Sequence, residues 1–145
     1  MKKQQRNACG FTLVELMAVL LIVALLAGLA AKSFMGQTEK AKVITTKATI
    51  KTLHGAVNMF KLDTGRYPSE EMGLVELVEQ PTDVEGWSLE GYLESTEIPR
   101  DAWKNEFVYM LNPESGKPFV IISYGADGKE GGEGNDFDLW STDTD

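Results

Sequence analysis

Five acidic side chains crowd into one glycine-rich segment near the carboxyl end of the sequence. Five of the eleven residues from 125 to 135 are glycine, and such a segment loses much conformational entropy when it becomes ordered. Carboxylates and backbone carbonyls on a flexible loop are the hard oxygen ligands that Ca²⁺ prefers. The residue types therefore allow a calcium site, although most acidic glycine-rich loops are solvated surface. The acids are Asp127, Glu130, Glu133, Asp136 and Asp138.

The spacing of these acids does not match an EF-hand calcium loop. Counted from Asp127, Gly132 falls at the sixth position and Asp138 at the twelfth, as that loop requires. However, Lys129 and Gly131 stand where the loop needs side-chain ligands. A calcium site here would need a different ligand arrangement.

A sixth notable acid, Glu15, stands at the start of an apolar run. From Leu16 to Ala31 there is no charged residue and no proline. A helix over 11–31 would be about 30 Å long, the thickness of the hydrocarbon core of a bilayer. An acid within a membrane span is costly unless it has a partner. Glu15 either reaches the membrane interface or finds a positively charged partner.

Other residues that could do chemistry are too sparse for an enzyme active site. His54 is the only histidine and Cys9 the only cysteine. The chain therefore has no internal disulfide and no thiol metal site. No serine lies in a nucleophile-turn motif, and His54 falls beside the apolar face of a predicted helix. The pattern favours a structural protein over an enzyme.

Charge is distributed unevenly along the chain. The sequence has 22 acidic and 14 basic side chains and a net charge of −8, whereas nucleic-acid binding needs clustered Lys and Arg. Lys2, Lys3 and Arg6 all precede residue 11. Positive charge on the amino side of an apolar span predicts a cytoplasmic amino end and an exported carboxyl end.

A single long helix is predicted to hold the apolar run. No proline interrupts residues 11–67, and Gly65 and Pro68 mark the end. A helix over 11–63 would be roughly 80 Å long, lipid-embedded in its first half and amphipathic in its second. The predicted core face has helical spacing: Thr46, Ile50, Leu53, Val57 and Phe60, continued toward the amino end by Ala41, Ile44 and Ala48.

The remaining segments predict a small head with an antiparallel sheet, and an α+β class overall. A short helix begins at Ser69 and ends before Pro81. The segment 82–105 is loop-like, and we expect Trp87, Tyr92, Leu93 and Trp103 to anchor it. Strand-forming residues predict strands at 106–111 and 118–124 joined by a turn, and a third short strand within 136–142.

The amino end resembles a type IV prepilin processing site. A basic leader is followed by Gly10-Phe11-Thr12-Leu13-Val14-Glu15 and then by the apolar helix. The resemblance implies that a prepilin peptidase cleaves between Gly10 and Phe11 and methylates the new amino group of Phe11. It also implies that Glu15 acts in assembly.

Three later segments resemble the major pseudopilin, or G subunit, of type II secretion systems. In that family the last loop binds Ca²⁺, so the resemblance implies side-chain ligands Asp127 and Asp138, with Asp136 as a further candidate. It also implies backbone ligands at the carbonyls of Tyr124 and Lys129. The segments are Phe60-Lys61-Leu62-Asp63-Thr64-Gly65-Arg66-Tyr67-Pro68, Ile98-Pro99-Arg100-Asp101-Ala102-Trp103 and the stretch from Ser123 to Asp136.

The resemblance implies the division of the chain and its partners. The expected parts are a leader (1–10), a transmembrane and assembly half (11–32) and an amphipathic half (33–64) of the helix, and a head with the calcium loop (65–145). The protein would cross the bacterial inner membrane once, with its head in the periplasm. It would polymerise with itself and contact membrane lipid, minor pseudopilins, the prepilin peptidase and the inner-membrane assembly platform, but not nucleic acid.

This resemblance predicts a structural subunit of the periplasmic pseudopilus that drives export of folded proteins. On this hypothesis Glu15 pairs with the amino group of Phe11 in a neighbouring subunit, where low dielectric strengthens the attraction. Two alternatives remain at this stage. One is a pilus or DNA-uptake subunit, and the other is a monomeric membrane-anchored calcium-binding module.

Overall fold

The computed structural model describes residues 11–143, and at 31–35 and 135 it describes the backbone alone. The chain forms one long α-helix, α1 (Leu13–Thr64), three short strands and three short 3₁₀ helices. It divides into two compact units, of which the first ends at Thr38 and the second begins at Glu39. The predicted α+β class is confirmed.

The first unit is the apolar half of α1. Its residues Leu13–Ala30 have a mean hydropathy of 2.7, and none of them is buried in this single chain. The segment is long and apolar enough to cross a membrane. Gly28 lies within it without interrupting the helix. The apolar surface of this segment therefore has no cover from the chain itself.

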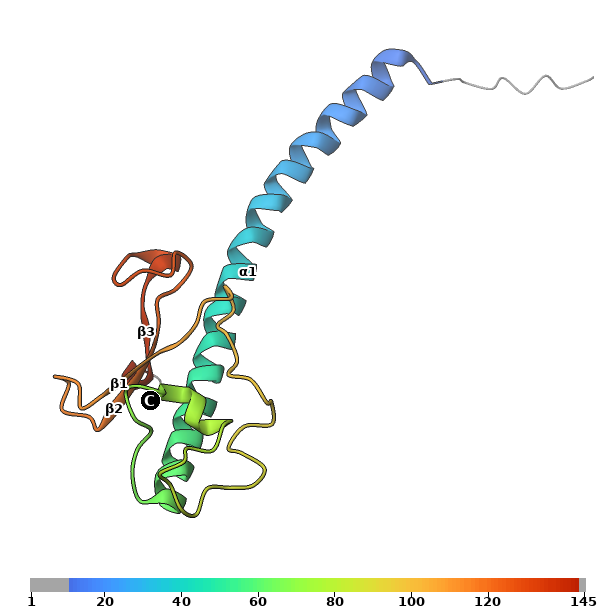
Figure 1. Ribbon diagram of the computed structural model, residues 1–145. Helices are drawn as coiled ribbons and strands as arrows, with labels where there is room; N and C mark the ends of the chain where they lie inside the picture. Colours follow the sequence, from blue (N-terminus) through green and yellow to red (C-terminus); the bar gives the residue numbers. More distant parts are fainter. Residues whose placement is uncertain (1–10, 144–145) are drawn as a thin grey trace, which may run out of the picture. The chain divides into compact units, whose positions relative to one another are not determined.

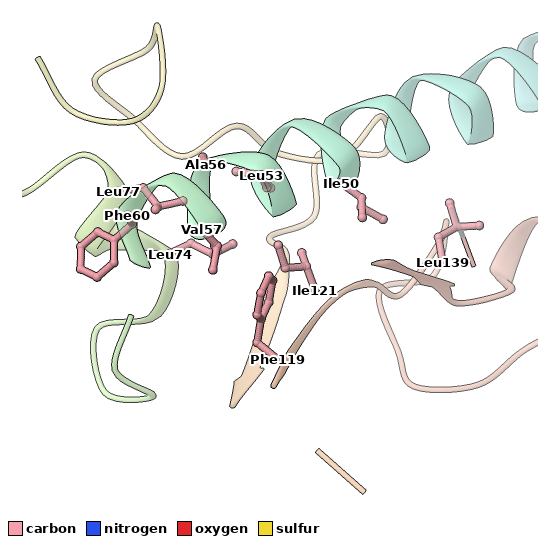
Figure 2. Packing of buried hydrophobic residues seen from close by; sticks show 10 residues of the cluster. All are labelled: Ile50, Leu53, Ala56, Val57, Phe60, Leu74, Leu77, Phe119, Ile121 and Leu139. Atoms are coloured by element: carbon pink, nitrogen blue, oxygen red, sulfur yellow. The ribbon is translucent and has the colours of Figure 1, made fainter. Parts of the chain in front are cut away.

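In the second unit one face of α1 forms one side of the hydrophobic core (Figure 2). The predicted face is confirmed, because every one of its five residues is fully buried: Thr46, Ile50, Leu53, Val57 and Phe60. Phe119 and Ile121 of the sheet and Leu74 and Leu77 pack against this face. The three- and four-residue spacing of the sequence thus aligns one stripe of α1 with the head.

The predicted continuation of this face toward the amino end is wrong. Ile44 is 68% exposed, and Ala41 and Ala48 are exposed as well. Each of these residues lies two positions before a buried or half-buried residue, which places it about 200° around the helix. The core face continues instead through Val43, which packs against the core.

The carboxyl end of α1 is fixed by a glycine and by a buried carboxylate. Gly65 has φ of +80° and donates its N–H to the Lys61 carbonyl at 2.9 Å, the left-handed cap that the sequence predicts. The side chain of Arg66 donates to Glu76 Oε2 at 2.7 Å. Glu76 is only 1% exposed, and its carbonyl accepts the indole N–H of Trp87 at 2.9 Å. This network connects the helix end to the loops beneath it.

The predicted short helix at Ser69 is a turn followed by a 3₁₀ helix, η1 (Gly73–Leu77). Ser69 still caps the turn, since its Oγ accepts the N–H of Met72 at 3.3 Å. Gly73 has φ of +56°, outside the right-handed helical region. Gly73 is the first residue of η1, and its positive φ breaks the right-handed helical path between the turn and the rest of η1.

The head contains a three-stranded antiparallel sheet in the order β1-β2-β3 (Figure 1). The strands are β1 (Val108–Leu111), β2 (Phe119–Ser123) and β3 (Leu139–Trp140). All five residues of β2 are buried, as befits the central strand. At the free edge of β1, the N–H of Leu111 donates to Glu70 Oε1 at 3.2 Å. The three strands lie where the sequence predicts them, although β3 has only two residues.

Aromatic side chains hold the long loop between η1 and β1 against the core. The four predicted anchors Trp87, Tyr92, Leu93 and Trp103 are partly buried against it, which confirms the prediction. Tyr92 contacts Phe60 edge-on at 5.4 Å between ring centroids. The indole N–H of Trp103 donates to Glu39 Oε2 at 3.0 Å. The loop is thus attached at both ends of the buried helix face.

We expect Phe60→Ala to lower the free energy of unfolding by about 3–5 kcal/mol, because it empties a fully buried aromatic site. The neighbouring Met59 is 56% exposed, so Met59→Ala serves as a matched control and should have little effect. Urea unfolding of the full chain in detergent, followed by tryptophan fluorescence, measures both. Equal effects of the two substitutions would contradict this packing.

Candidate functional site

The acidic glycine-rich segment connects β2 to β3 and contains the 3₁₀ helix η2 (Gly134–Asp136). Its glycines are needed by the fold at particular positions. Gly132 has φ of +103°, and a Cβ there would lie 2.5 Å from the carbonyl oxygen of Asp136. The segment therefore turns back tightly upon itself between residues 131 and 136, which only glycine permits.

Asp138 is the most unusual acid of this segment. It is 6% exposed, and its Oδ2 accepts the N–H of Gly131 at 2.9 Å. Its Oδ1 is buried and has no hydrogen-bond partner among the described residues. An unsatisfied buried carboxylate oxygen is costly. An acceptor of this kind is suited to bind a cation.

Glu130 adds to the negative potential near Asp138, and the Tyr124 phenol responds to both carboxylates. Burial, together with the carboxylates of Glu130 and Asp138, raises the pKa of the Tyr124 phenol. The same carboxylates that disfavour a phenolate favour a bound cation. Tyr124 is one of the two residues whose backbone carbonyls the family resemblance implies as calcium ligands.

The remaining predicted ligands do not converge through their side chains. Asp127 is exposed, and its Oδ1 accepts the N–H of Lys129 at 3.1 Å in a local turn. Asp136 is half-buried. Within residues 11–143 no group of three or more His, Cys, Asp or Glu side chains is placed to hold a metal. The donor set fits a cation only if backbone carbonyls supplement Asp138.

A second buried carboxylate positions this segment, and sequence reasoning missed it. Asp101 is 5% exposed, and its Oδ1 accepts the N–H groups of Trp103 at 2.9 Å and Asn105 at 2.8 Å. Its Oδ2 accepts the hydroxyl of Ser123, the last residue of β2, at 2.7 Å. Unlike Asp138, Asp101 uses both of its oxygens.

Asn105 extends this connection to the first turn of the glycine-rich segment. Its Nδ2 donates to the carbonyl of Gly125 at 2.8 Å. A Cβ at Gly128 would lie 3.2 Å from Asn105 Oδ1, so the amide packs closely on the turn. Asp101 and Asn105 thus join the loop before β1 to the loop after β2. The only sequence signal was an Asp followed four residues later by an Asn within a loop.

The structure gives Glu15 a local role that the sequence analysis also missed. The Thr12 N–H and hydroxyl both donate to Glu15 Oε2 at 3.3 Å, and Thr12 Oγ1 accepts the Glu15 N–H at 3.2 Å. This reciprocal pair is a capping box at the start of α1. The signal was present as Thr-x-x-Glu immediately before an apolar run. Phe11 is 85% exposed, and Gly10 lies outside the described residues.

Comparisons with known proteins identify the family. A model described as Type II secretion system (T2SS), protein G matches residues 33–142, and one described as Prokaryotic N-terminal methylation motif matches residues 5–31. The Type II secretion system core protein G of Pseudomonas aeruginosa is 42% identical over 143 residues, covering 97% of this chain and 99% of that protein. The chain belongs to the protein G family of the type II secretion system.

Other relatives agree with this membership. The core protein G of Vibrio cholerae is 37% identical over 139 residues, covering 94% of this chain and 93% of that protein. The crystal structure of the major pseudopilin from the type 2 secretion system of enterohaemorrhagic Escherichia coli superposes with a TM-score of 0.63 and 28% identity. It covers 73% of this chain and 87% of that one.

Family membership confirms the assignment that the resemblance suggested, and it favours a secretion-system subunit over a pilus or DNA-uptake subunit. The apolar start of α1 agrees with membrane anchoring, and the methylation motif agrees with a structural subunit that is processed. The ligand set for calcium and the pairing of Glu15 across subunits stay predictions.

We expect Asp101→Ala to lower the free energy of unfolding by about 3 kcal/mol, because it leaves three hydrogen-bond donors unpaired in a buried site. Asp83 offers a matched control, since it is 71% exposed and pairs with Arg66 at 3.2 Å. Asp83→Ala should cost less than about 1 kcal/mol. Urea unfolding in calcium-free buffer measures both, and a loss at Asp101 no larger than at Asp83 would refute this role.

Proposed function

We propose that this chain is the repeating subunit of a periplasmic pseudopilus that drives export of folded proteins. It is cleaved after Gly10, methylated at Phe11 and held in the inner membrane by the start of α1 until it joins the fibre. Support comes from one observation above the others. The apolar segment Leu13–Ala30 is entirely uncovered in the single chain, and a bundle of identical helices covers it.

When the apolar segment of α1 moves from lipid into a fibre, the driving force must come from something other than the hydrophobic effect. Lipid tails already solvate an apolar helix, so helices associate in membranes through packing and polar contacts. Glu15 is the one charged residue in the first unit's apolar segment. Among residues 11–143 its partners are the neutral groups of Thr12, and none of them compensates its charge. Cleavage after Gly10 creates a positive amino group at Phe11 that a neighbouring copy can present to it.

Assembly draws on further partners of the same membrane. Processing requires a prepilin peptidase, and polymerisation requires an inner-membrane assembly platform. Minor pseudopilins join the same fibre as additional subunits. The protein itself performs no catalysis in this scheme, and its chemistry is limited to being cleaved and methylated.

We expect Glu15→Gln to insert and to be processed but to polymerise poorly. Gln also forms a capping box at this position, so this variant removes the charge and keeps the local hydrogen bonds. Filament yield, measured by shearing and immunoblotting, should fall at least roughly tenfold, because the buried ion pair is lost. Intact mass of the membrane-extracted protein verifies processing, as the loss of residues 1–10 and the gain of a methyl group.

Glu15→Leu serves as the comparison, because it removes both the charge and the cap. If charge pairing drives assembly, the two variants should be equally defective. Normal yield from Glu15→Gln with poor yield from Glu15→Leu would show that capping alone matters, and it would overturn the proposed pairing.

We also propose that the β2–β3 segment binds Ca²⁺. Support comes from the unpartnered Oδ1 of Asp138 and from the tight turn at Gly132. Asp138 supplies a carboxylate oxygen, and the carbonyls of Tyr124 and Lys129 are proposed to complete the site. Asp127 and Asp136 are further candidate side-chain ligands. The ion supplies positive charge that satisfies the carboxylates and orders the glycine-rich chain.

Calcium should raise the melting temperature of the full chain in detergent, by an amount that grows with ion concentration. Asp138→Asn should abolish most of this rise, because it removes the buried negative charge. Glu133 lies in the same segment and is exposed, so Glu133→Gln serves as the control and should retain the rise. A melting temperature independent of calcium would contradict the proposal.

A further inference from the structure

Two charged hollows of opposite sign occur on the second unit. The first is a cavity of about 390 Å³ lined by residues of α1, of the start of β2 and of the carboxyl end. Two lysines from distant parts of the chain, Lys51 and Lys117, line it, and no acidic side chain among residues 11–143 does so. In a chain with 22 acids and 14 bases, a hollow with positive lining only is unusual.

His54 adds a fixed donor to this cationic pocket. The Nδ2 of Asn58 donates to Nδ1 of His54 at 3.2 Å, so the ring carries its proton on Nε2. The ring also packs on Phe119 with 4.8 Å between centroids, which holds its orientation. Within residues 11–143 neither Lys51 nor Lys117 forms an ion pair. As far as the structure describes the chain, the pocket offers hydrogen-bond donors and positive charge without a counter-ion.

The second hollow has the opposite character. It has a volume of about 480 Å³ and lies between η1, the loop before β1 and β1 itself. The one cation that lines it in the described part of the chain, Arg100, is bound to Glu106 at 2.7 Å. The side chains of Glu71, Glu79 and Glu97 form no ion pair among the described residues. The acids that line it are Glu70, Glu71, Glu79, Glu97 and Glu106.

A helical polymer of identical subunits requires two different surfaces that fit each other. An open filament is built from heterologous contacts, in which one surface of a subunit meets a different surface of the next. Heads with a large excess of acids repel one another when they are packed together. A contact that places unpaired acids against unpaired lysines removes this repulsion and sets the orientation of the two copies.

We propose that the cationic pocket of one copy receives carboxylates from the acidic hollow of the next copy in the pseudopilus. This inference rests on the proposed polymerisation and adds to it the surfaces through which the heads meet. The occupant is a second copy of this chain, and its recognised groups are exposed glutamates such as Glu71 and Glu97. The contact is separate from the apolar helix and from Glu15.

Charge reversal and its compensation test the pairing in the full chain assembled in its native membrane. Lys51→Glu with Lys117→Glu should lower the yield of sheared filaments at least roughly tenfold, because like charges placed across an interface are strongly unfavourable. Glu71→Lys with Glu97→Lys should do the same. The variant with all four changes should recover most of the wild-type yield, because the complementary charges are exchanged.

Two controls separate assembly from folding and from total charge. Lys61→Glu with Lys104→Glu changes the net charge as much as the reversal in the pocket, and it should leave the yield near that of the wild type. Melting temperatures of all variants in detergent should remain close to the wild-type value. A reversal in the pocket that lowers the yield only when it also lowers the melting temperature would overturn the inference.

The remaining outcomes are equally decisive. Unchanged yield from either pair of reversals, or no recovery in the four-fold variant, overturns the pairing and leaves the proposed function intact. If inorganic phosphate raises the melting temperature of the wild type and the reversed pocket keeps a normal yield, the pocket binds small anions and the inference is wrong. Failure of the wild-type chain to polymerise would instead refute the proposed function itself.

Discussion

An apolar helical surface has to be shielded from water, and this chain buries only part of the apolar surface of α1. The face of α1 that carries Phe60 lies beneath the sheet, whereas Leu13–Ala30 is bare along its whole length. In the proposed function, lipid covers that surface in the membrane and identical helices cover it in the fibre. Because both surroundings are apolar, the change between them costs little hydrophobic free energy. Polar and charged contacts then decide which surrounding the helix occupies.

Three buried carboxylates organise the head, and they differ in how well they are satisfied. Glu76 is paired with Arg66 and Asp101 uses both of its oxygens on nearby donors. These two attach loops to the core and complete their bonding within the chain. Asp138 has one oxygen hydrogen-bonded to Gly131 and one that has no partner within residues 11–143. Because the other two buried carboxylates have their hydrogen bonds completed within the chain, Asp138 stands out as the candidate for binding an ion.

Much of this fold follows from patterns in the sequence, because the strongest signals are long and periodic. The apolar run, the uninterrupted spacing up to Phe60 and the glycine at position 65 predict α1 and its end closely. The prediction fails at Ile44 because a residue two positions before the core face lies almost opposite to it on the helix. The 3₁₀ helix was missed because the positive φ of Gly73 depends on packing, which composition does not reveal.

The sequence indicates which segment holds the candidate site, but it does not indicate which atoms would bind the ion. The glycines and acids of residues 125–138 indicate a cation-binding segment, but the unpaired oxygen of Asp138 depends on burial and on one amide seven residues away. The roles of Asp101 and Asn105 depend on contacts with Ser123 and Gly125, which lie about twenty residues further along the chain. Neither contact has a periodic signal in the sequence.

The hydrogen bond from the Leu111 N–H to the Glu70 carboxylate affects how β1 can pair with other molecules. The outer edge of β1 exposes main-chain groups that could recruit a strand from another molecule. The Glu70 carboxylate occupies one of these amides and brings negative charge to the border of the sheet. If the chain assembles through its helices as proposed, this carboxylate also disfavours strand addition of the amyloid type, which would join the subunits in the wrong way.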